Sequence, residues 1–264
     1  MNRVVSFSSG KGGVGKTSVV ANMGKLLAKS GQKVLLVDGD WTLGKLRITL
    51  GVKTEWTIEQ VLNGEMGIEK AIAPVCENLF LLASPNGILD FNELTEIQRT
   101  QLFFEMESLE DRFDWILLDH SSGIGQDVLH FAAAAHEHVI LTTSEPTSYT
   151  DAYAIMKVLS KRFSINEFKV VVTMSHNLVE SWGIIDRFAD VARSKLGVKV
   201  KVIDVFDFDQ RVSECLRGGD LFVNKYPESI LAQKLEKAIY SLCKGTQKQN
   251  GLRFFYGKTT NLLG

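Results

Sequence analysis

Gly10-Lys11-Gly12-Gly13-Val14-Gly15-Lys16-Thr17 is the stretch that decides the fold of this chain. It has the form G-x-x-x-x-G-K-[ST], follows an apolar β-type run at residues 3–8 and precedes a helical pattern from Thr17 to Ser30. Strand, glycine loop and helix form the context of a phosphate-binding loop, because glycines let backbone N–H groups and a helix N-terminus face a phosphate. We expect Lys16 to reach the β- and γ-phosphates of a nucleotide and the Thr17 hydroxyl to hold Mg²⁺.

Alternating strand and helix patterns extend from this loop over most of the 264 residues. Apolar β-type runs recur at Val4–Ser8, Lys33–Val37, Leu79–Ala83, Trp115–Leu118, His138–Thr142, Val170–Thr173 and Val200–Val205. Apolar spacings of three and four predict helices at Thr17–Ser30, Thr57–Asn63, Leu94–Ser108, Gln126–Ala135, Ser148–Phe163, Glu180–Leu196 and Glu228–Leu242. Strands that are apolar throughout are typical of a parallel sheet that is covered on both faces. The predicted fold is α/β, a doubly wound, mostly parallel sheet with helices on both faces.

Residues 1–244 are expected to form one P-loop domain. They contain no repeat and no linker, and a hydrophobic content of 45% is ordinary for such a domain. From about Lys244 the sequence becomes polar and then apolar again. We therefore expect residues 245–264 to be a flexible link followed by a short amphipathic segment.

Carboxylates stand at the ends of two predicted strands, where ligands bind in doubly wound sheets. Asp38 and Asp40 follow one strand, and Asp119 follows Trp-Ile-Leu-Leu in the form of a Walker B aspartate. An Asp at a strand end is also common as a helix N-cap, but three that converge on one phosphate loop favour a metal site. The predicted metal-binding residues are Thr17, Asp38, Asp40 and Asp119.

Composition argues against several classes of protein. No apolar stretch reaches the ~18 residues that span a bilayer, and no secretory signal pattern follows Met1, so we expect a cytoplasmic protein. The histidines at 130, 136 and 138 lack ligand-type neighbours at metal-binding spacing. Neither a disulfide framework nor a zinc or iron–sulfur site is indicated by the three cysteines, which are far apart and include no CxxC pair: Cys76, Cys215 and Cys243.

The C-terminal end is basic. Residues 225–264 contain seven Lys and Arg against two Glu, although the whole chain has a formal net charge of −1. This asymmetry points to an anionic partner, either a membrane surface or nucleic acid, although a solvated helix explains much of it. On a helical projection of 251–264, one side carries Leu252, Phe255, Tyr256, Thr259 and Leu263. We expect this segment to bind anionic lipid weakly, and packing on its own domain is the alternative.

Lys11 is a sharper clue than the rest of the loop, although a solvated loop lysine remains the alternative. The run KGGVGKT resembles the deviant Walker A motif of the MinD/ParA group, P-loop ATPases of the SIMIBI type. Residues 38–44 with Leu50-Gly51 resemble switch I of MinD-type ATPases, and residues 119–124 resemble switch II. Three further segments resemble MinD and still more its FlhG (FleN) branch: Glu145–Ser148, Asp151–Tyr153 and Asp207–Val212.

The resemblance implies that the chain binds ATP with Mg²⁺ and forms a face-to-face homodimer in the ATP state. In this group the early lysine crosses the dimer interface to the partner's nucleotide, much as an arginine finger does. The implied catalytic residues are therefore Lys11, Lys16 and Asp40, of which Asp40 orients the attacking water. The implied nucleotide-binding residues are Gly10, Lys11, Gly12, Gly13, Val14, Gly15, Lys16, Thr17, Ser18, Thr173, Phe206 and Asp207.

Within the predicted site, the chain departs from the family pattern at two places. Thr173 stands where family members commonly carry an Asn that reads adenine. His120-Ser121-Ser122 stands in switch II where a Thr-Pro-Ala or Thr-Gly-Ala type of sequence is usual. His120 is therefore a candidate for a hydrogen-bonding group near the γ-phosphate.

The function implied by the resemblance is that of a slow, Mg²⁺-dependent ATPase that regulates flagellar number and placement. Its implied partners are a second copy of the chain, a membrane in the ATP state, and a flagellar protein such as FlhF or a switch component. A ParA-type partition ATPase that binds DNA and a MinD-type division-site regulator are the alternatives. An iron–sulfur carrier of the nitrogenase reductase type shares the phosphate loop but needs cysteines that this chain lacks.

Overall fold

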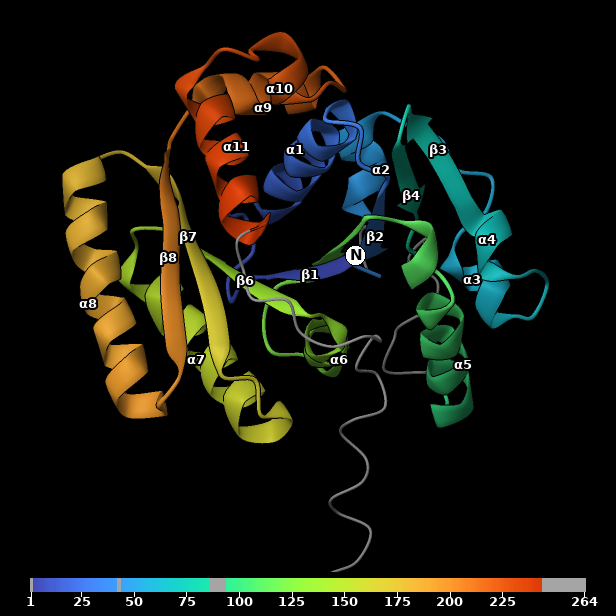
Figure 1. The fold of residues 1–264 in the computed structure, drawn as a ribbon, viewed down its shortest axis with the longest axis horizontal. Helices are drawn as coiled ribbons and strands as arrows, with labels where there is room; N and C mark the ends of the chain where they lie inside the picture. Colours follow the sequence, from blue (N-terminus) through green and yellow to red (C-terminus); the bar gives the residue numbers. More distant parts are fainter. Residues whose placement is uncertain (1, 42–43, 86–93, 244–264) are drawn as a thin grey trace, which may run out of the picture.

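The computed structural model describes residues 2–41, 44–85 and 94–243, which form a sheet between two layers of helices (Figure 1). Within these residues the sheet has eight strands: β1 (Arg3–Ser8), β2 (Val34–Gly39), β3 (Ile72–Cys76), β4 (Leu79–Leu82), β5 (Trp115–His120), β6 (Glu137–Thr142), β7 (Glu167–Ser175) and β8 (Lys199–Asp207). Their order is β3-β4-β2-β5-β1-β6-β7-β8, and every neighbouring pair is parallel except β3 and β4. The predicted α/β fold with a mostly parallel sheet is confirmed.

Helices cover both faces of the sheet. One face packs against α1 (Lys16–Lys29), α2 (Lys45–Leu50), α9 (Gln210–Arg217), α10 (Phe222–Lys225) and α11 (Ile230–Cys243). The other face packs against α3 (Ile58–Leu62), α4 (Ile68–Ala71), α5 (Glu96–Glu107), α6 (Gln126–Ala134), α7 (Pro146–Phe163) and α8 (Leu178–Leu196). Because both faces are covered, β2 and β5 are buried at every position, which explains their continuous apolar sequence.

Capping residues set the starts of several helices. α3 and α5 each begin with a capping box, in which Thr57 pairs with Gln60 and Thr95 pairs with Gln98. α7 begins at Pro146, two residues before the predicted start, because proline fits the first turn of a helix, where its missing N–H has no helical partner.

Seven strands were predicted, and the eighth, β3, was missed. Its sequence Ile-Ala-Pro-Val-Cys carries Pro74, which is tolerated because β3 is an antiparallel strand at the edge of the sheet. Four short helices were also missed: α2, α4, α9 and α10, of 6, 4, 8 and 4 residues. Helical periodicity cannot be read over so few residues, so these helices depend on the packing around them.

Some predictions fall on residues outside the described ranges. These are the boundary at 244/245, the amphipathic segment 251–264, and residues 42–43 of the segment that resembles switch I. Within the described ranges, no helix combines the length and the apolar character that crossing a membrane requires.

Candidate functional site

The phosphate loop lies at the carboxyl end of β1, in the middle of the sheet. β1 has β5 on one side and β6 on the other (Figure 1). The connection after β1 leads to β2 on the β5 side, whereas the connection after β5 leads to β6 on the opposite side of β1. Ligands of doubly wound sheets bind at such a switch point. On the adjoining pair of strands, β2 and β5, Asp38 and Asp119 are partners in register. The sheet therefore brings the loop and these two carboxylates to one edge.

Glycine is required in the loop for two different structural reasons. Gly13 and Gly15 have φ angles of 82° and 81°, which lie in the left-handed region that favours glycine. Gly10 is required by packing instead, because a Cβ atom there would lie 2.1 Å from the Cβ of Asp151 in α7. The first glycine of the motif therefore lets α7 approach the loop, which the sequence could not indicate.

Lys16 is buried at the end of the loop. Its Nζ donates to Asp119 Oδ1 at 2.6 Å and to the backbone oxygen of His120, and the residue is only 8% exposed. The predicted phosphate-contacting lysine and the predicted Walker B aspartate therefore form a buried ion pair. The Lys16 ammonium therefore lies inside the phosphate-binding site of its own chain.

Lys11 lies at the surface instead. Its Nζ is 2.6 Å from Glu145 Oε2, and the two side chains are 48% and 61% exposed. An exposed pair of this kind stabilises a fold by about 0–1 kcal/mol, so the lysine is held only weakly. The two lysines of the loop therefore differ in both burial and partner.

Asp38 and Asp119 are both fully buried. Asp38 accepts hydrogen bonds from the backbone N–H groups of Asp40 at 3.1 Å and Leu46 at 2.9 Å, and so holds the loop that follows β2. Burial and the nearby Asp119 raise the pKa of Asp38 to about 7. Asp119 Oδ2 is buried and has no hydrogen-bond partner within the part of the chain that the structure describes.

These residues fit a magnesium ion. Hard oxygen donors of the kind that Mg²⁺ prefers are provided by Asp119, whose buried Oδ2 has no hydrogen-bond partner in the described residues, and by the hydroxyl of the half-buried Thr17. Asp40 is buried, and its carboxylate pairs with the Lys45 ammonium at 2.9 Å. Across residues 2–41, 44–85 and 94–243, no group of three or more His, Cys, Asp or Glu could hold a metal alone.

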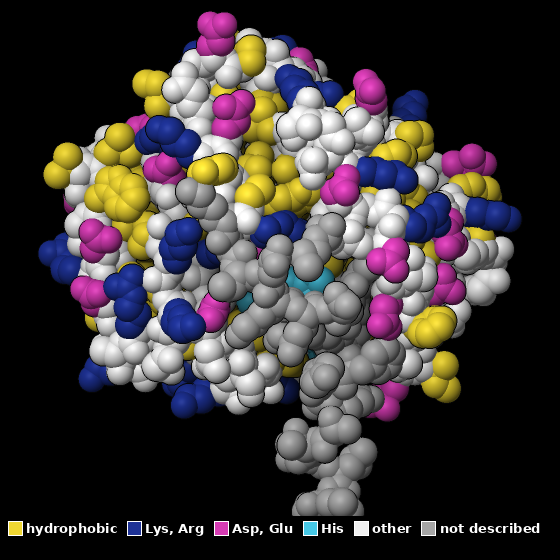
Figure 2. Space-filling view, viewed as in Figure 1, with side chains coloured by type: hydrophobic (Ala, Val, Ile, Leu, Met, Phe, Trp, Pro, Cys, Tyr) yellow, Lys and Arg dark blue, Asp and Glu magenta, His cyan; other side chains and the backbone are white. Residues whose placement is uncertain are grey.

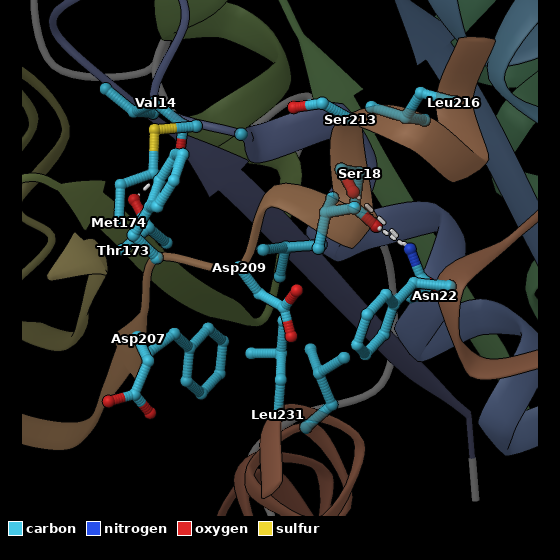
Figure 3. A pocket seen from close by; sticks show the side chains of 17 residues that line it. Val14, Ser18, Asn22, Thr173, Met174, Asp207, Asp209, Ser213, Leu216 and Leu231 are labelled. Atoms are coloured by element: carbon cyan, nitrogen blue, oxygen red, sulfur yellow. Dashed lines mark hydrogen bonds between the residues drawn. The ribbon is translucent and has the colours of Figure 1, made fainter. Parts of the chain in front are cut away.

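A pocket of about 110 Å³ opens beside the loop (Figure 3). Six predicted nucleotide-binding residues line it: Val14, Gly15, Ser18, Thr173, Phe206 and Asp207. The sequence did not identify the remaining wall, which comes from α1, the ends of β7 and β8, and the helices α9, α10 and α11: Val19, Asn22, Met174, Phe208, Asp209, Val212, Ser213, Leu216, Phe222, Leu231 and Leu235. The sequence predicted α11 as a helix from its apolar spacing, but such spacing does not show which element a helix covers.

Thr173 ties β7 to the phosphate loop. Its hydroxyl lies 2.7 Å from the backbone oxygen of Val14 and 3.2 Å from that of Thr142, and it donates toward both. The next residue, Met174, has a φ of 55°, and its side chain lies close to Gly15. Thr173 therefore lines the pocket, and its only hydroxyl proton is already engaged by backbone oxygens.

The segment that resembles switch II follows β5. His120 is fully buried, and burial together with the ammonium of Lys16 lowers its pKa to about 3, so the ring is neutral. Its Nε2 lies 3.1 Å from Ser8 Oγ and its Nδ1 lies 3.2 Å from the Ser121 backbone oxygen. The backbone N–H of Gly123 donates to the oxygen of Ser9 at 2.9 Å.

Comparison with known proteins agrees with this geometry. Residues 2–168 match the family model described as "AAA domain". The Antiactivator FleN of Pseudomonas aeruginosa is 28% identical over 86% of this chain and 81% of its own length. The Flagellum site-determining protein YlxH of Helicobacter pylori is 27% identical over 99% of this chain and 91% of its own. The Septum site-determining protein MinD of Synechocystis sp. is 31% identical over 84% of this chain and 82% of its own.

Solved structures give the same result. A chain of the MinC:MinD cell division protein complex of Aquifex aeolicus has a TM-score of 0.74 and 25% identity, and the match covers 94% of this chain and 99% of that chain. MinD of Pyrococcus horikoshii, complexed with Mg-ADP, has a TM-score of 0.71 and 28% identity, with 92% and 97% covered. The phosphate loop, the paired carboxylates and these matches together show that the chain belongs to the MinD/ParA family of P-loop ATPases, with FleN, YlxH and MinD among its relatives.

Proposed function

We propose that this chain is a slow, Mg²⁺-dependent ATPase that dimerises on ATP and regulates the number and placement of flagella. The placement of the two loop lysines carries the proposal. Lys16 is buried against Asp119, whereas Lys11 lies at the surface, held by one exposed carboxylate. Lys16 would serve the chain's own nucleotide, and Lys11 would serve the nucleotide of a second copy.

The residues of the site have distinct roles in this proposal. Backbone N–H groups of residues 10–18 and the start of α1 bind the phosphates. Thr17 and, through water, Asp119 hold Mg²⁺, with Asp38 and Asp40 beside it; when bound, the ion neutralises charge on the β- and γ-phosphates. Asp40 orients the water that attacks the γ-phosphate, and the lysines stabilise the charge that develops.

The pocket beside the loop is the proposed base site. Its lining combines backbone next to Val14 with the apolar walls of Phe206 and α9, which suits a flat heterocycle. Three polar residues of this pocket belong to the predicted nucleotide-binding set: Ser18, Thr173 and Asp207. Asp207 is held by Lys234 at 2.6 Å, so its carboxylate has a fixed place at the pocket.

The names of two relatives support the proposed flagellar function. FleN is called an antiactivator and YlxH a flagellum site-determining protein, and both match more than four fifths of this chain. We propose a flagellar partner, FlhF or a switch component, and a cytoplasmic chain that joins the membrane through residues 251–264 in the ATP state. Division-site regulation is the second candidate, because MinD of Synechocystis sp. is 31% identical.

DNA partition is less favoured. Non-specific DNA binding uses a continuous basic surface. On the face in Figure 2, the described Lys and Arg side chains are interspersed with Asp and Glu.

The test is complementation in a flagellated bacterium that lacks its own FleN. The wild-type chain should restore the normal number of flagella, and a Lys11→Ala variant produced to the same level should not. Correction of cell division in a MinD-deficient strain, without any effect on flagella, would move the assignment to the second candidate. A pull-down with Asp40→Ala locked in the ATP state would then identify the bound partner.

A further inference from the structure

We propose that His120 is a positioning residue, which fixes the turn of residues 120–123 above the phosphate loop through its hydrogen bond with Ser8. The inference concerns this chain's own version of switch II and rests on the proposed ATPase function for its kinetic consequence. The hydrogen bond joins two side chains that are fully buried at the ends of β5 and β1.

The neighbours of His120 determine which way its hydrogen bonds run. The backbone oxygen of Ser121 can only accept, so Nδ1 of His120 donates to it at 3.2 Å. In a neutral ring the other nitrogen, Nε2, is then the acceptor, and the Ser8 hydroxyl donates to it at 3.1 Å. Both hydrogen bonds are satisfied together by the neutral tautomer that carries its proton on Nδ1.

The turn is tied to the loop at both of its ends. Ser8 holds His120 at the start, and the backbone oxygen of Ser9 accepts from the N–H of Gly123 at 2.9 Å. Between these two hydrogen bonds the turn lies near the loop, because a Cβ atom added at Gly12 would lie 3.5 Å from Ser122 Oγ. Two consecutive residues of the β1 end therefore hold the turn over the phosphate-binding glycines.

Position 120 lies where β5 comes close to β2. On β2, Gly39 is paired with His120, and a Cβ atom there would lie 3.1 Å from the Cβ of His120. A larger residue at position 39 would therefore require a small shift of the strand end that carries the imidazole.

Lys16 takes no part in the hydrogen bond between Ser8 and His120. Lys16 also contacts this strand end, at Asp119 and at the backbone oxygen of His120. When phosphates attract the ammonium, these two contacts are given up, whereas the Ser8 hydroxyl and the imidazole lose nothing. The turn would then keep its place at the γ-phosphate end while the lysine changes partner.

Replacing His120 by glutamine or by asparagine tests the two hydrogen bonds of the ring separately, because each amide retains only one of them. In His120→Gln the amide oxygen reaches the place of Nε2 and still accepts from Ser8. In His120→Asn the amide retains the donor toward Ser121 but does not reach Ser8. For the full chain, we expect His120→Asn and Ser8→Ala each to lower kcat about tenfold with the KM for ATP within about twofold, as one lost hydrogen bond predicts.

His120→Gln should keep kcat within about threefold, and Ser8→Ala should have no further effect in the His120→Asn background. Amide hydrogen exchange of residues 120–123 is the second readout, and it needs no hydrolysis: it should become faster in His120→Asn and Ser8→Ala but not in His120→Gln. Ser8→Ala removes a single oxygen, so it carries the test even where His120→Asn does not fold.

The outcomes separate the two proposals. A wild-type chain that hydrolyses ATP, with variants of unchanged kcat and unchanged exchange, overturns the positioning role. An additive effect of Ser8→Ala in the His120→Asn background overturns it as well. If the wild-type chain does not hydrolyse ATP but its variants still show the expected amide exchange, the proposed ATPase function is refuted. The same result supports the positioning role of the Ser8–His120 hydrogen bond.

Discussion

At the scale of single residues, burial divides the charged groups of the site into two kinds. The Lys16–Asp119 pair is buried, so removing one partner leaves an uncompensated charge inside the protein, which is strongly destabilising. The Lys11–Glu145 pair is exposed and contributes little to the free energy of unfolding. Substitution of Lys11 can therefore report on function without disturbing the fold, whereas substitution of Lys16 disturbs both.

Lys11→Ala should bind ATP within a few-fold of the wild-type affinity but should not dimerise on ATP. Lys16 and the loop N–H groups still hold the phosphates, whereas the positive charge for the partner's nucleotide is gone. Light scattering with ATP and Mg²⁺ measures the dimer. Glu145→Gln is the matched control, because it breaks the same ion pair and keeps Lys11, and it should still dimerise. An intact Lys11→Ala dimer would refute the role across the interface.

Asp40→Ala should bind ATP and dimerise but hydrolyse about 10²–10⁴-fold more slowly. Removing a group that orients water lowers the rate more than the affinity. Steady-state phosphate release and nucleotide binding measure the two effects separately. Lys45→Ala is the control, because it removes the same 2.9 Å ion pair and leaves the carboxylate in place. Normal turnover by Asp40→Ala would assign the role to another group, with Asp38 the next candidate.

At the scale of elements, the nucleotide pocket depends on contacts between segments that are distant in sequence. β7 is fastened to the loop by Thr173, and α11 closes the other side through Leu231 and Leu235. α1 is joined to α10 by the side-chain oxygen of Asn22, which accepts from the N–H of Val223 at 3.0 Å. The pocket therefore keeps its shape only while these elements remain docked.

Thr173→Val should lower ATP affinity about tenfold and the free energy of unfolding by about 1–2 kcal/mol. Valine has the shape of threonine but leaves the backbone oxygens of Val14 and Thr142 without their shared donor. Nucleotide titration and chemical denaturation measure the two losses. If Thr173 instead reads the base, the variant would lose its discrimination between ATP and GTP while its stability stays near that of the wild type.

At the scale of the whole molecule, α11 connects the nucleotide pocket with the opposite edge of the sheet. Its first turns line the pocket, where Lys234 donates to Asp207. At its other end, the guanidinium of Arg3 donates to the backbone oxygens of Leu242 and Cys243 at 2.7 and 2.6 Å. Because Arg3 begins β1, α11 ends at the amino-terminal edge of the sheet, away from the loop (Figure 1).

Residues 251–264 should attach the ATP form to anionic membranes. One weak amphipathic segment binds lipid marginally, and two copies in a dimer add avidity. In sedimentation with anionic liposomes, ATP and Mg²⁺ should raise the pelleted fraction and ADP should not. Truncation after Lys248 should abolish the effect, and Phe255→Glu in the full chain is the matched single change. Equal pelleting of the truncated chain would assign the segment to packing or to a protein partner.

The sequence by itself determined the phosphate loop, the seven apolar strands, the longer helices and the carboxylates at the ends of β2 and β5. These features depend on residue types at short spacings, which local periodicity and motif order express directly. Tertiary structure alone decided that β3 joins the edge, that α9 and α11 wall the pocket, that Lys16 rests on Asp119 and that Thr173 holds the loop. The Ser8–His120 bond joins residues 112 positions apart. Such contacts follow from strand order and register, and a one-dimensional pattern specifies neither, because burial of the apolar runs is satisfied by many pairings.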